Sequence, residues 1–310
     1  MGKFKMQEIT GVIAAMITPY DKDENVDTGR INALVDFLLE RDIDGLYLTG
    51  STGEGFLMTS DERKNVVETV VKRVAGRKPV IVHIGDIGTR KSIDLACHAY
   101  DTGVDAISSV PPFYWNFGAE DIYHYYRDIS QATPLPMIVY NVPMAGLMNT
   151  ELLLRLSTLS NVRGIKFTGK DHAQMSHLKE VLGKEFKIYS GCDEMAFSGL
   201  SVGADGIIGS FYNVMPETFK QIYACVKNGQ IEQGTRLQHI ATEIILECIQ
   251  YDYLALLHNM IGWQGVDMGW SRRPFRNYEE AELADLKRKL RVTRDKYQVK
   301  ESEVHFLAAL

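Results

Sequence analysis

One lysine is the clearest candidate for a nucleophile. Lys166 lies in the segment VRGIKFT (162–168), which has the apolar, β-rich composition of a strand. Side chains alternate between the two faces of a strand, so Lys166 is expected to share a face with Gly164 and Thr168. A lysine kept from water favours its neutral amine, which attacks a carbonyl carbon to form an imine. The alternative is a lysine at a strand end whose ammonium reaches solvent, and position alone does not separate the two.

A tyrosine at the end of the preceding strand-like run is the candidate acid–base group. Tyr140 closes the apolar part of PMIVYNV (136–142). If the two strands are neighbours, its phenol can carry a proton to and from a substrate hydroxyl. A buried tyrosine with a hydrogen-bonded hydroxyl is the commoner use of this residue. The catalytic interpretation of Tyr140 therefore depends on its being close to Lys166.

The segment GSTGEG (50–55) follows another strand-like run and forms a candidate carboxylate site. Backbone N–H groups and the hydroxyls of Ser51 and Thr52 can bind a carboxylate there without an arginine. No GK[ST] ending follows, so the segment is not a Walker A loop. The alternative is an ordinary turn whose hydroxyls bond to the local backbone. The glycines, which permit close approach of another group, favour the binding site.

Two adjacent acids, Asp193 and Glu194, follow a further apolar run. Carboxylates in this place can accept hydrogen bonds from a substrate rich in hydroxyl groups. Equally, Asp193 can cap the next helix while Glu194 complements the helix dipole. Ser210 also follows a strand-like run. Tyr114 lies in the aromatic segment PPFYW (111–115), which is more typical of packing than of chemistry.

These residues need a scaffold, and strand-like and helical segments alternate along the chain. The strand-like runs are short and apolar, as in parallel strands covered on both faces; they span 11–18, 45–49, 79–85, 105–110, 136–142, 162–168, 186–191 and 205–210. Helical patterns lie between these runs. One begins at the capping signature Thr59–Glu62, and the others span 28–41, 89–102, 119–132, 149–158, 171–183, 194–202 and 215–228.

Eight consecutive units predict an α/β protein with a (β/α)8 TIM barrel, whose active site lies at the carboxyl ends of its strands. No GxGxxG follows the first strand, which disfavours a Rossmann fold. Beyond about residue 230 the strand signals stop, and 231–250, 253–263 and 278–297 are expected to be helices. We therefore expect residues 1–228 to form the barrel with its active site, and 229–310 to form a C-terminal helical extension packed on it.

Composition narrows the classes of partner. The chain has 310 residues, 45% of them apolar and 24% charged, which is typical of a globular protein. Its net charge of −6 disfavours a nucleic acid or an anionic membrane as partner. The first residues lack the apolar run of a signal peptide, and no run reaches membrane-spanning length. The four cysteines form no CxxC, so we expect no disulfide framework, no zinc site and a cytoplasmic location.

In their order and spacing, these motifs are those of a known family. The chain resembles the superfamily of dihydrodipicolinate synthases and N-acetylneuraminate lyases over roughly residues 8–295. The resemblance rests on GSTGE (50–54), PPFYW (111–115), YNVP (140–143), GIKFT (164–168), GADGIIGS (203–210) and RRPF (272–275). Within the superfamily, SGCDE (190–194) and GSFYN (209–213) are most similar to the lyase branch.

The resemblance implies a class I aldolase that cleaves N-acetylneuraminate reversibly to N-acetylmannosamine and pyruvate without a metal or other cofactor. Lys166 would form the Schiff base, and Tyr140 would be the acid–base residue. Ser51 and Thr52 would bind the pyruvyl carboxylate. A homotetramer is also implied, with Tyr114 near a subunit interface. The sugar hydroxyls and the glycerol tail would be held by Thr168, Gly191, Asp193, Glu194 and Ser210.

Two departures qualify the resemblance. The synthases carry an arginine shortly after YNVP, whereas this chain has PMAGL (143–147), which disfavours dihydrodipicolinate synthesis. The same segment is about one residue shorter than the lyase pattern. Three alternatives stay open: a related pyruvate-dependent aldolase for another 2-keto-3-deoxy sugar acid, a dihydrodipicolinate synthase, and a sugar-acid-binding barrel without turnover. Retention of both Lys166 and Tyr140 disfavours the last of these.

Overall fold

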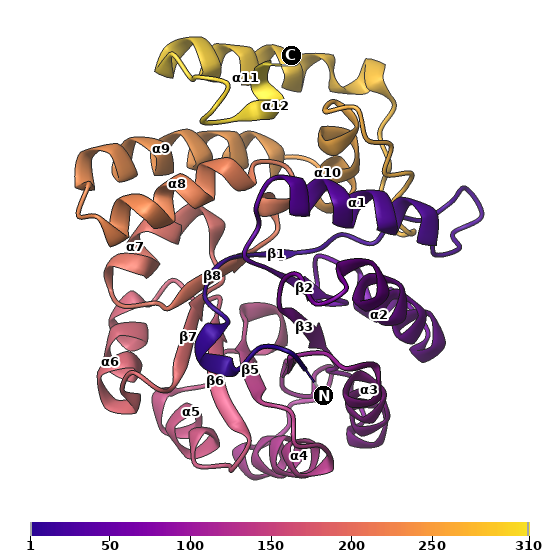
Figure 1. Cartoon of the computed structure of the whole chain (residues 1–310), viewed down its shortest axis with the longest axis vertical. Helices are drawn as coiled ribbons and strands as arrows, with labels where there is room; N and C mark the ends of the chain where they lie inside the picture. Colours follow the sequence, from indigo (N-terminus) through magenta and orange to yellow (C-terminus); the bar gives the residue numbers. More distant parts are fainter. Residues whose placement is uncertain (1, 309) are drawn as a thin grey trace.

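The computed structural model describes residues 2–308 and 310, and its centre is a closed barrel of eight parallel strands (Figure 1). Each strand pairs with the next along the chain, and β1 pairs with β8 to close the ring. The expected (β/α)8 barrel is therefore confirmed. The strands are β1 (Gly11–Ala15), β2 (Gly45–Leu48), β3 (Val80–His83), β4 (Ala106–Ser109), β5 (Met137–Asn141), β6 (Val162–Phe167), β7 (Lys187–Ser190) and β8 (Gly206–Gly209).

A helix follows every strand and packs outside the barrel (Figure 1). These helices are α1 (Thr28–Glu40), α2 (Ser60–Val74), α3 (Thr89–Thr102), α4 (Ala119–Ala132), α5 (Thr150–Ser157), α6 (His172–Leu182), α7 (Ala196–Ser201) and α8 (Pro216–Lys227). The capping signature is confirmed, because the Thr59 side chain accepts from the N–H of Glu62, whose carboxylate accepts from the N–H of Thr59. This exchange satisfies free N–H groups at the start of α2.

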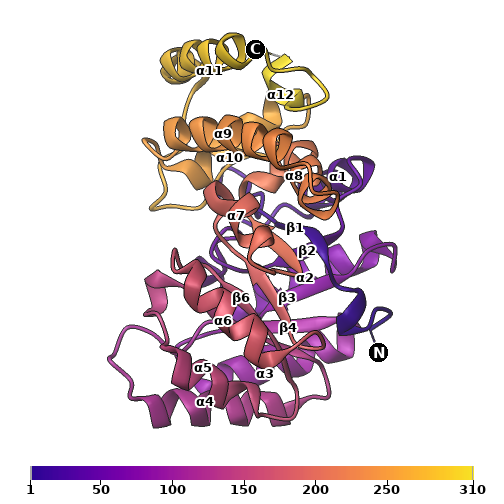
Figure 2. The same ribbon diagram turned by 90° about the vertical axis from the view of Figure 1, so that its left-hand side faces the viewer.

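The rest of the chain stacks on one side of the barrel (Figure 2). It forms α9 (Ile231–Cys248), α10 (Tyr253–Gly262), α11 (Ala284–Tyr297) and α12 (His305–Ala308). The expected division at residue 228 falls in the turn between α8 and α9, two helices that pack against each other. The expectation of one helix over 278–297 is wrong at its start, because Glu280–Leu283 forms a 3-10 turn before α11.

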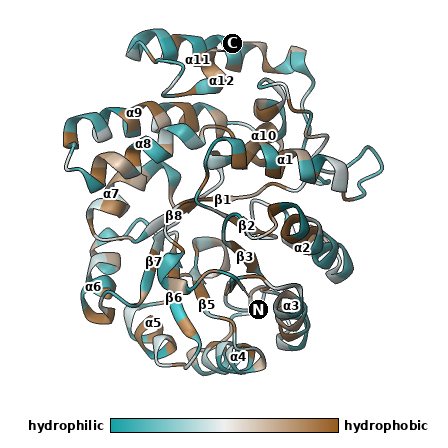
Figure 3. Ribbon diagram, in the orientation of Figure 1, coloured by the Kyte–Doolittle hydropathy of each residue, from teal (hydrophilic) through white to brown (hydrophobic). Residues whose placement is uncertain are grey.

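Apolar side chains fill two layers. One cluster lies inside the barrel and includes Ile13, Tyr47, Ile138, Tyr140 and Tyr189. A larger cluster joins the outer faces of the strands to the surrounding helices and continues into α9 and α10. Along the outer helices the hydropathy alternates, with polar residues on the exposed faces (Figure 3). Within residues 2–308 and 310, no helix is long and apolar enough to span a bilayer.

Candidate active site

Lys166 lies on β6 with its side chain inside the barrel, and only 4% of the residue is exposed. Its neighbours Ile165 and Phe167 belong to the outer cluster, as alternation along a strand requires. The Nζ atom lies 4.5 Å from the ring centroid of Tyr47 and 4.1 Å from that of Tyr140. The alternative of an ammonium that reaches solvent is therefore wrong, and the lysine instead lies against two aromatic rings that stabilise a positive charge.

Tyr140 lies directly beside Lys166. The two residues are paired across β5 and β6, so the hydrogen bonds of the barrel fix their relative position. Tyr140 packs edge-on against Tyr47 and His83, with ring centroids 6.2 and 6.1 Å away. Burial holds the pKa of His83 well below its usual value, so this imidazole is neutral. A phenol held by rigid neighbours next to an amine suits a group that transfers protons.

The GSTGEG turn lies between β2 and α2 at the same end of the barrel. Thr52 is buried, and its hydroxyl is 2.7 Å from the hydroxyl of Ser210, which follows β8. Two residues expected in different parts of the site, one for the carboxylate and one for the sugar, are thus in direct contact. Ser51 lines a mainly apolar cavity of about 430 Å³ beside Phe56 and Phe113.

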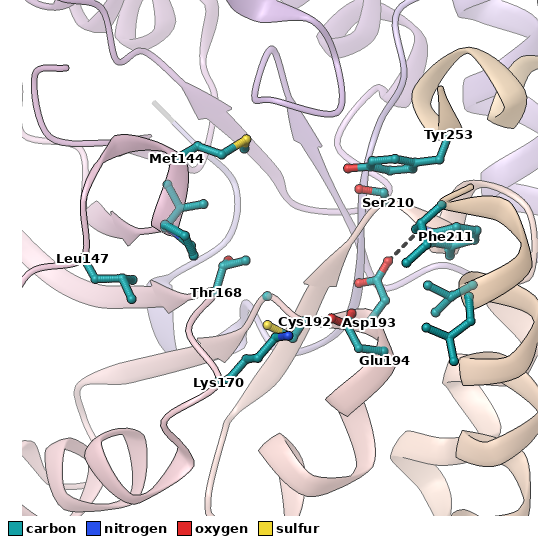
Figure 4. A pocket seen from close by; sticks show the side chains of 16 residues that line it. Met144, Leu147, Thr168, Lys170, Cys192, Asp193, Glu194, Ser210, Phe211 and Tyr253 are labelled. Carbon is teal, nitrogen blue, oxygen red and sulfur yellow. Dashed lines mark hydrogen bonds between the residues drawn. The ribbon is translucent and has the colours of Figure 1, made fainter. Parts of the chain in front are cut away.

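A second cavity, of about 560 Å³, lies over the ends of β6, β7 and β8 (Figure 4). Five expected sugar-binding residues line it, namely Thr168, Gly191, Asp193, Glu194 and Ser210. Gly191 separates this cavity from the lysine: a Cβ there would lie 3.2 Å from Cε of Lys166 and would overlap the Thr168 hydroxyl. The two cavities share Val142, Met144 and Tyr253 in their walls.

Asp193 is buried at the base of the larger cavity. Its Oδ2 atom accepts a hydrogen bond of 2.9 Å from the N–H of Phe211 (Figure 4). Its Oδ1 atom has no hydrogen-bond partner within residues 2–308 and 310 and lies so close to Gly209 that a Cβ there would overlap it. Burial, with a smaller contribution from the charge of Glu194, raises the pKa of Asp193 to about 7. The helix-cap alternative is wrong, since Met195 is the cap residue of α7.

Helix α9 supports the turn that carries the two acids. Gln238 donates to the carbonyl of Asp193 (3.1 Å), and Thr242 donates to the carbonyl of Glu194 (3.2 Å). This support was not predicted from the sequence. One feature of the sequence could have indicated a buried polar contact: Gln238 lies on the face of the helix that also carries the apolar residues Ala241 and Ile245, both of which are buried. The C-terminal extension therefore contributes directly to the site.

Tyr253, at the start of α10, is a further residue that the sequence analysis missed. Its ring lines both cavities, and its hydroxyl lies beside that of Ser210 (Figure 4). Burial raises the pKa of Tyr253 to about 12, with Asp193 as a further cause. The hydroxyl therefore stays protonated at neutral pH and can donate a hydrogen bond. No local pattern distinguishes this tyrosine from the others in the chain.

Tyr114 lies apart from these residues. It has a φ of 82°, is 82% exposed and lines neither of the two cavities. Its ring packs edge-on against Trp115, which is also exposed. Within one chain, Tyr114 is therefore not part of the site formed by Lys166 and Tyr140.

Comparison with known proteins gives the relatives of this arrangement. The model of the dihydrodipicolinate synthetase family matches residues 8–293. The N-acetylneuraminate lyase of Rhizobium meliloti (strain 1021) is 38% identical over 282 residues, which cover 90% of this chain and 94% of that protein.

Solved structures give the same result. The N-acetylneuraminate lyase of Mycoplasma synoviae has a TM-score of 0.86 and 32% identity, covering 94% of this chain and 99% of that one. A catalytic lysine mutant of the Ruminococcus gnavus sialic acid aldolase has a TM-score of 0.90 and 28% identity, covering 96% of this chain and 99% of that one. The similarity thus extends over the barrel and most of the helical extension.

Proposed function

The chain belongs to the dihydrodipicolinate synthetase family, and we propose that it is an N-acetylneuraminate lyase, which cleaves N-acetylneuraminate reversibly to N-acetylmannosamine and pyruvate. It is a class I aldehyde-lyase. One observation carries the proposal: Lys166 is buried at the end of β6, with its amine against the ring of Tyr140, beneath a cavity lined by hydroxyl groups and carboxylates.

The proposed reaction begins with the amine of Lys166. It attacks the C2 keto carbon of the open-chain sugar acid, and loss of water leaves a protonated imine. The C3–C4 bond then breaks, and its electron pair moves toward the iminium to form an enamine. Tyr140 gives its proton to the water that leaves during imine formation, and the resulting phenolate then accepts the proton of the C4 hydroxyl as that oxygen becomes the aldehyde of N-acetylmannosamine. Protonation of the enamine at C3, followed by hydrolysis, releases pyruvate and the free lysine.

The two rings beside Nζ support this chemistry. The imine nitrogen carries a positive charge when protonated, and the faces of Tyr47 and Tyr140 lie within 4.5 Å of that nitrogen. An aromatic face stabilises such a cation by about 0.5–2 kcal/mol, with the larger value where water is excluded. Tyr47 is fixed in turn by a hydrogen bond of 3.1 Å between its hydroxyl and that of Ser108.

We assign the substrate contacts as follows. Ser51 and Thr52 bind the carboxylate, and the contact between Thr52 and Ser210 marks the boundary between the pyruvyl and sugar parts. The sugar hydroxyls and the glycerol tail are held by Thr168, Gly191, Asp193, Glu194 and Ser210, all of which line the larger cavity. The proposal also divides the chain at residue 228, with α9 and α10 of the extension completing the wall of this cavity.

We also propose a homotetramer in the cytoplasm. The exposed aromatic side chains of Tyr114 and Trp115 support an interface on the loop after β4, since such residues are enriched where subunits meet. The four cysteines, all free, support a reducing compartment.

Release of pyruvate from a panel of sugar acids tests the proposal. We expect the purified protein to cleave N-acetylneuraminate faster than simpler 2-keto-3-deoxy sugar acids, because the acids and hydroxyls of the larger cavity match a long polyhydroxylated tail. Cleavage of a simple ketodeoxy acid without cleavage of N-acetylneuraminate would overturn the choice of substrate. Condensation of pyruvate with an amino aldehyde to give a dihydrodipicolinate precursor would instead favour the synthases.

A further inference from the structure

Glu54 ends the turn that carries Ser51 and Thr52, and its side chain is fully buried. The residue is buried, with a left-handed φ of 55°. One carboxylate oxygen accepts a hydrogen bond of 2.6 Å from the hydroxyl of Ser271, and the other accepts one of 2.8 Å from the N–H of Arg272. These three residues, which we name the clasp, join the turn after β2 to the C-terminal extension across more than two thirds of the chain.

The extension side of the clasp is itself held firmly. The guanidinium of Arg272 donates to the carbonyl of Leu57 (2.9 Å) and to both oxygens of Glu62 (2.6 and 3.0 Å). It also donates to the carbonyl of Glu24 and lies 4.4 Å from the ring centroid of Tyr20. Arg272 thus binds Glu54 within the turn and also Leu57 and Glu62 just beyond it. These bonds hold the segment around Ser271 and Arg272 in a fixed position.

Two other hydrogen bonds hold the turn, one from the chain after β1 and one within the turn itself. The hydroxyl of Thr18 donates to the carbonyl of Gly53 (2.7 Å), and the N–H of Gly55 donates to the carbonyl of Gly50 (3.0 Å). Neither bond involves the extension. The bonds of Glu54 to Ser271 and Arg272 are those that connect the Gly50–Gly55 turn to the C-terminal segment. Glu54 is therefore the residue through which the extension can act on the Ser51–Thr52 backbone.

We propose that Glu54 is a positioning residue that, through Ser271 and Arg272, holds the Ser51–Thr52 turn in the conformation that binds the carboxylate of pyruvate. The C-terminal extension then supports the pyruvate site through the backbone of this turn. This inference rests on the proposed function. It adds that affinity for the keto acid depends on a contact between segments far apart in the sequence.

The charges around Glu54 are consistent with a positioning role. Burial raises the pKa of its carboxyl to about 7, while the bonds from Ser271 and Arg272 lower it. His258 of α10 has its Nε2 atom 3.9 Å from Glu54, and burial lowers the pKa of His258 to about 4, so it is neutral near pH 7. Tyr20 has its pKa raised by burial and is neutral as well. The clasp therefore holds the carboxylate of Glu54 mainly by hydrogen bonds, and the charge of Arg272 makes a smaller contribution.

The test measures how much pyruvate is needed to trap the protein with borohydride. Glu54→Gln keeps the shape of the side chain but removes its negative charge, so the hydrogen bond from the N–H of Arg272 becomes a weaker, neutral one, while the Ser271 hydroxyl can turn to accept from the new amide. We expect the half-saturating pyruvate concentration to rise about tenfold, while the trapping rate at saturating pyruvate changes less than about twofold. Ser271→Ala removes the other bond and should shift the half-saturation in the same direction by a smaller factor.

Glu303→Gln is the matched control. Glu303 is also a buried glutamate of the extension that accepts from a backbone N–H, that of Lys300, and from a side chain, that of Arg236. It belongs to a different network, so half-saturation should stay that of the wild type even if stability falls. An unchanged half-saturation in Glu54→Gln, or in Ser271→Ala if the first variant does not fold, overturns the inference. An equal rise in Glu303→Gln also overturns it. Failure of the wild type to trap pyruvate would instead contradict the proposed function.

Discussion

The two halves of the candidate site are built differently. At the pyruvate end, Lys166 and Tyr140 occupy paired positions on adjacent strands, and each is 4% exposed. At the sugar end, the cavity is bounded by loops and by α9, where Met144 is 75% exposed and Leu246 52%. The hydrogen bonds of the barrel thus fix the proposed nucleophile and base, whereas the proposed sugar contacts come from segments in several parts of the chain. Changes at the first end should act on rate, and changes at the second on binding.

Replacement of the nucleophile should have the largest effect. Lys166→Ala removes the amine that forms the imine, so we expect kcat for N-acetylneuraminate cleavage to fall by roughly 10⁴-fold or more. The closed barrel should persist, because β6 pairs with β5 and β7 through its backbone, which the substitution leaves unchanged. Circular dichroism and thermal unfolding check the fold. An unfolded variant would indicate that the lysine has a structural role, and retained turnover would remove it from the mechanism.

Loss of the phenol should come next. In Tyr140→Phe the ring that packs against Lys166 remains, but the oxygen that takes the C4 proton is gone. We expect kcat to fall by about 10²–10⁴-fold, with formation of the pyruvate imine slowed less. Stopped-flow cleavage and borohydride trapping separate the two steps. An equal loss of both steps would show that Tyr140 acts mainly on imine formation, and a kcat near the wild-type value would exclude it as the base.

At the sugar end, Asp193→Asn should change binding more than chemistry. The amide oxygen can still accept from the N–H of Phe211, so the local backbone should be retained. We expect KM for N-acetylneuraminate to rise about 10- to 100-fold, because a hydrogen bond to a charged group contributes about 1.5–3 kcal/mol. Half-saturation by pyruvate should stay the same. If pyruvate binding weakened equally, Asp193 would act at both the pyruvate end and the sugar end of the site, and the two ends would not be independent.

The same residue gives a pH dependence of stability. Burial raises the pKa of Asp193 from 3.8 to about 7, so between these values the folded protein holds a proton that the unfolded chain has lost. Stability should therefore fall as pH rises from about 4 to 7, with a slope of up to about 1.4 kcal/mol per pH unit from this group. The free energies of unfolding of the wild type and of Asp193→Asn should diverge over this range. If the two free energies of unfolding changed in parallel with pH, Asp193 would not be the source of the pH dependence.

The exposed rim should be the least sensitive region. Leu246→Ala removes a side chain that is half exposed, so stability should change by less than about 0.5 kcal/mol and KM by less than about threefold. Its neighbour Ile245 is 4% exposed and offers the contrast: Ile245→Ala should cost about 2–4 kcal/mol. Urea unfolding measures both. A large loss of stability in Leu246→Ala would show that the rim is covered in the assembled protein.

Much of the fold was predictable because parallel strands buried on both faces leave short apolar runs in the sequence. The helices at 89–102 and 119–132 match α3 and α4 at both ends. Strands were predicted slightly too long, as with 11–18 against β1, because buried loop residues such as Ile17 are as apolar as the strand itself.

The site was predictable only where one strand or turn carries it. Alternation gave the face of Lys166, and position after a strand gave Asp193. The partners that hold these groups were not predictable: Gln238 supports Asp193, and Ser271 holds Glu54, through contacts between distant segments. Such contacts leave no periodic pattern, because they depend on how the extension packs on the barrel.

The central claim is that Lys166 forms an imine with pyruvate, and reductive trapping tests it most directly. The protein is incubated with pyruvate, reduced with borohydride and digested, and the modified peptide is identified by mass spectrometry. We predict one equivalent of reduced pyruvate on Lys166, with Lys170 as the internal control, since Lys170 lines the larger cavity and is exposed. No adduct, or an adduct on Lys170 in place of Lys166, would contradict the account.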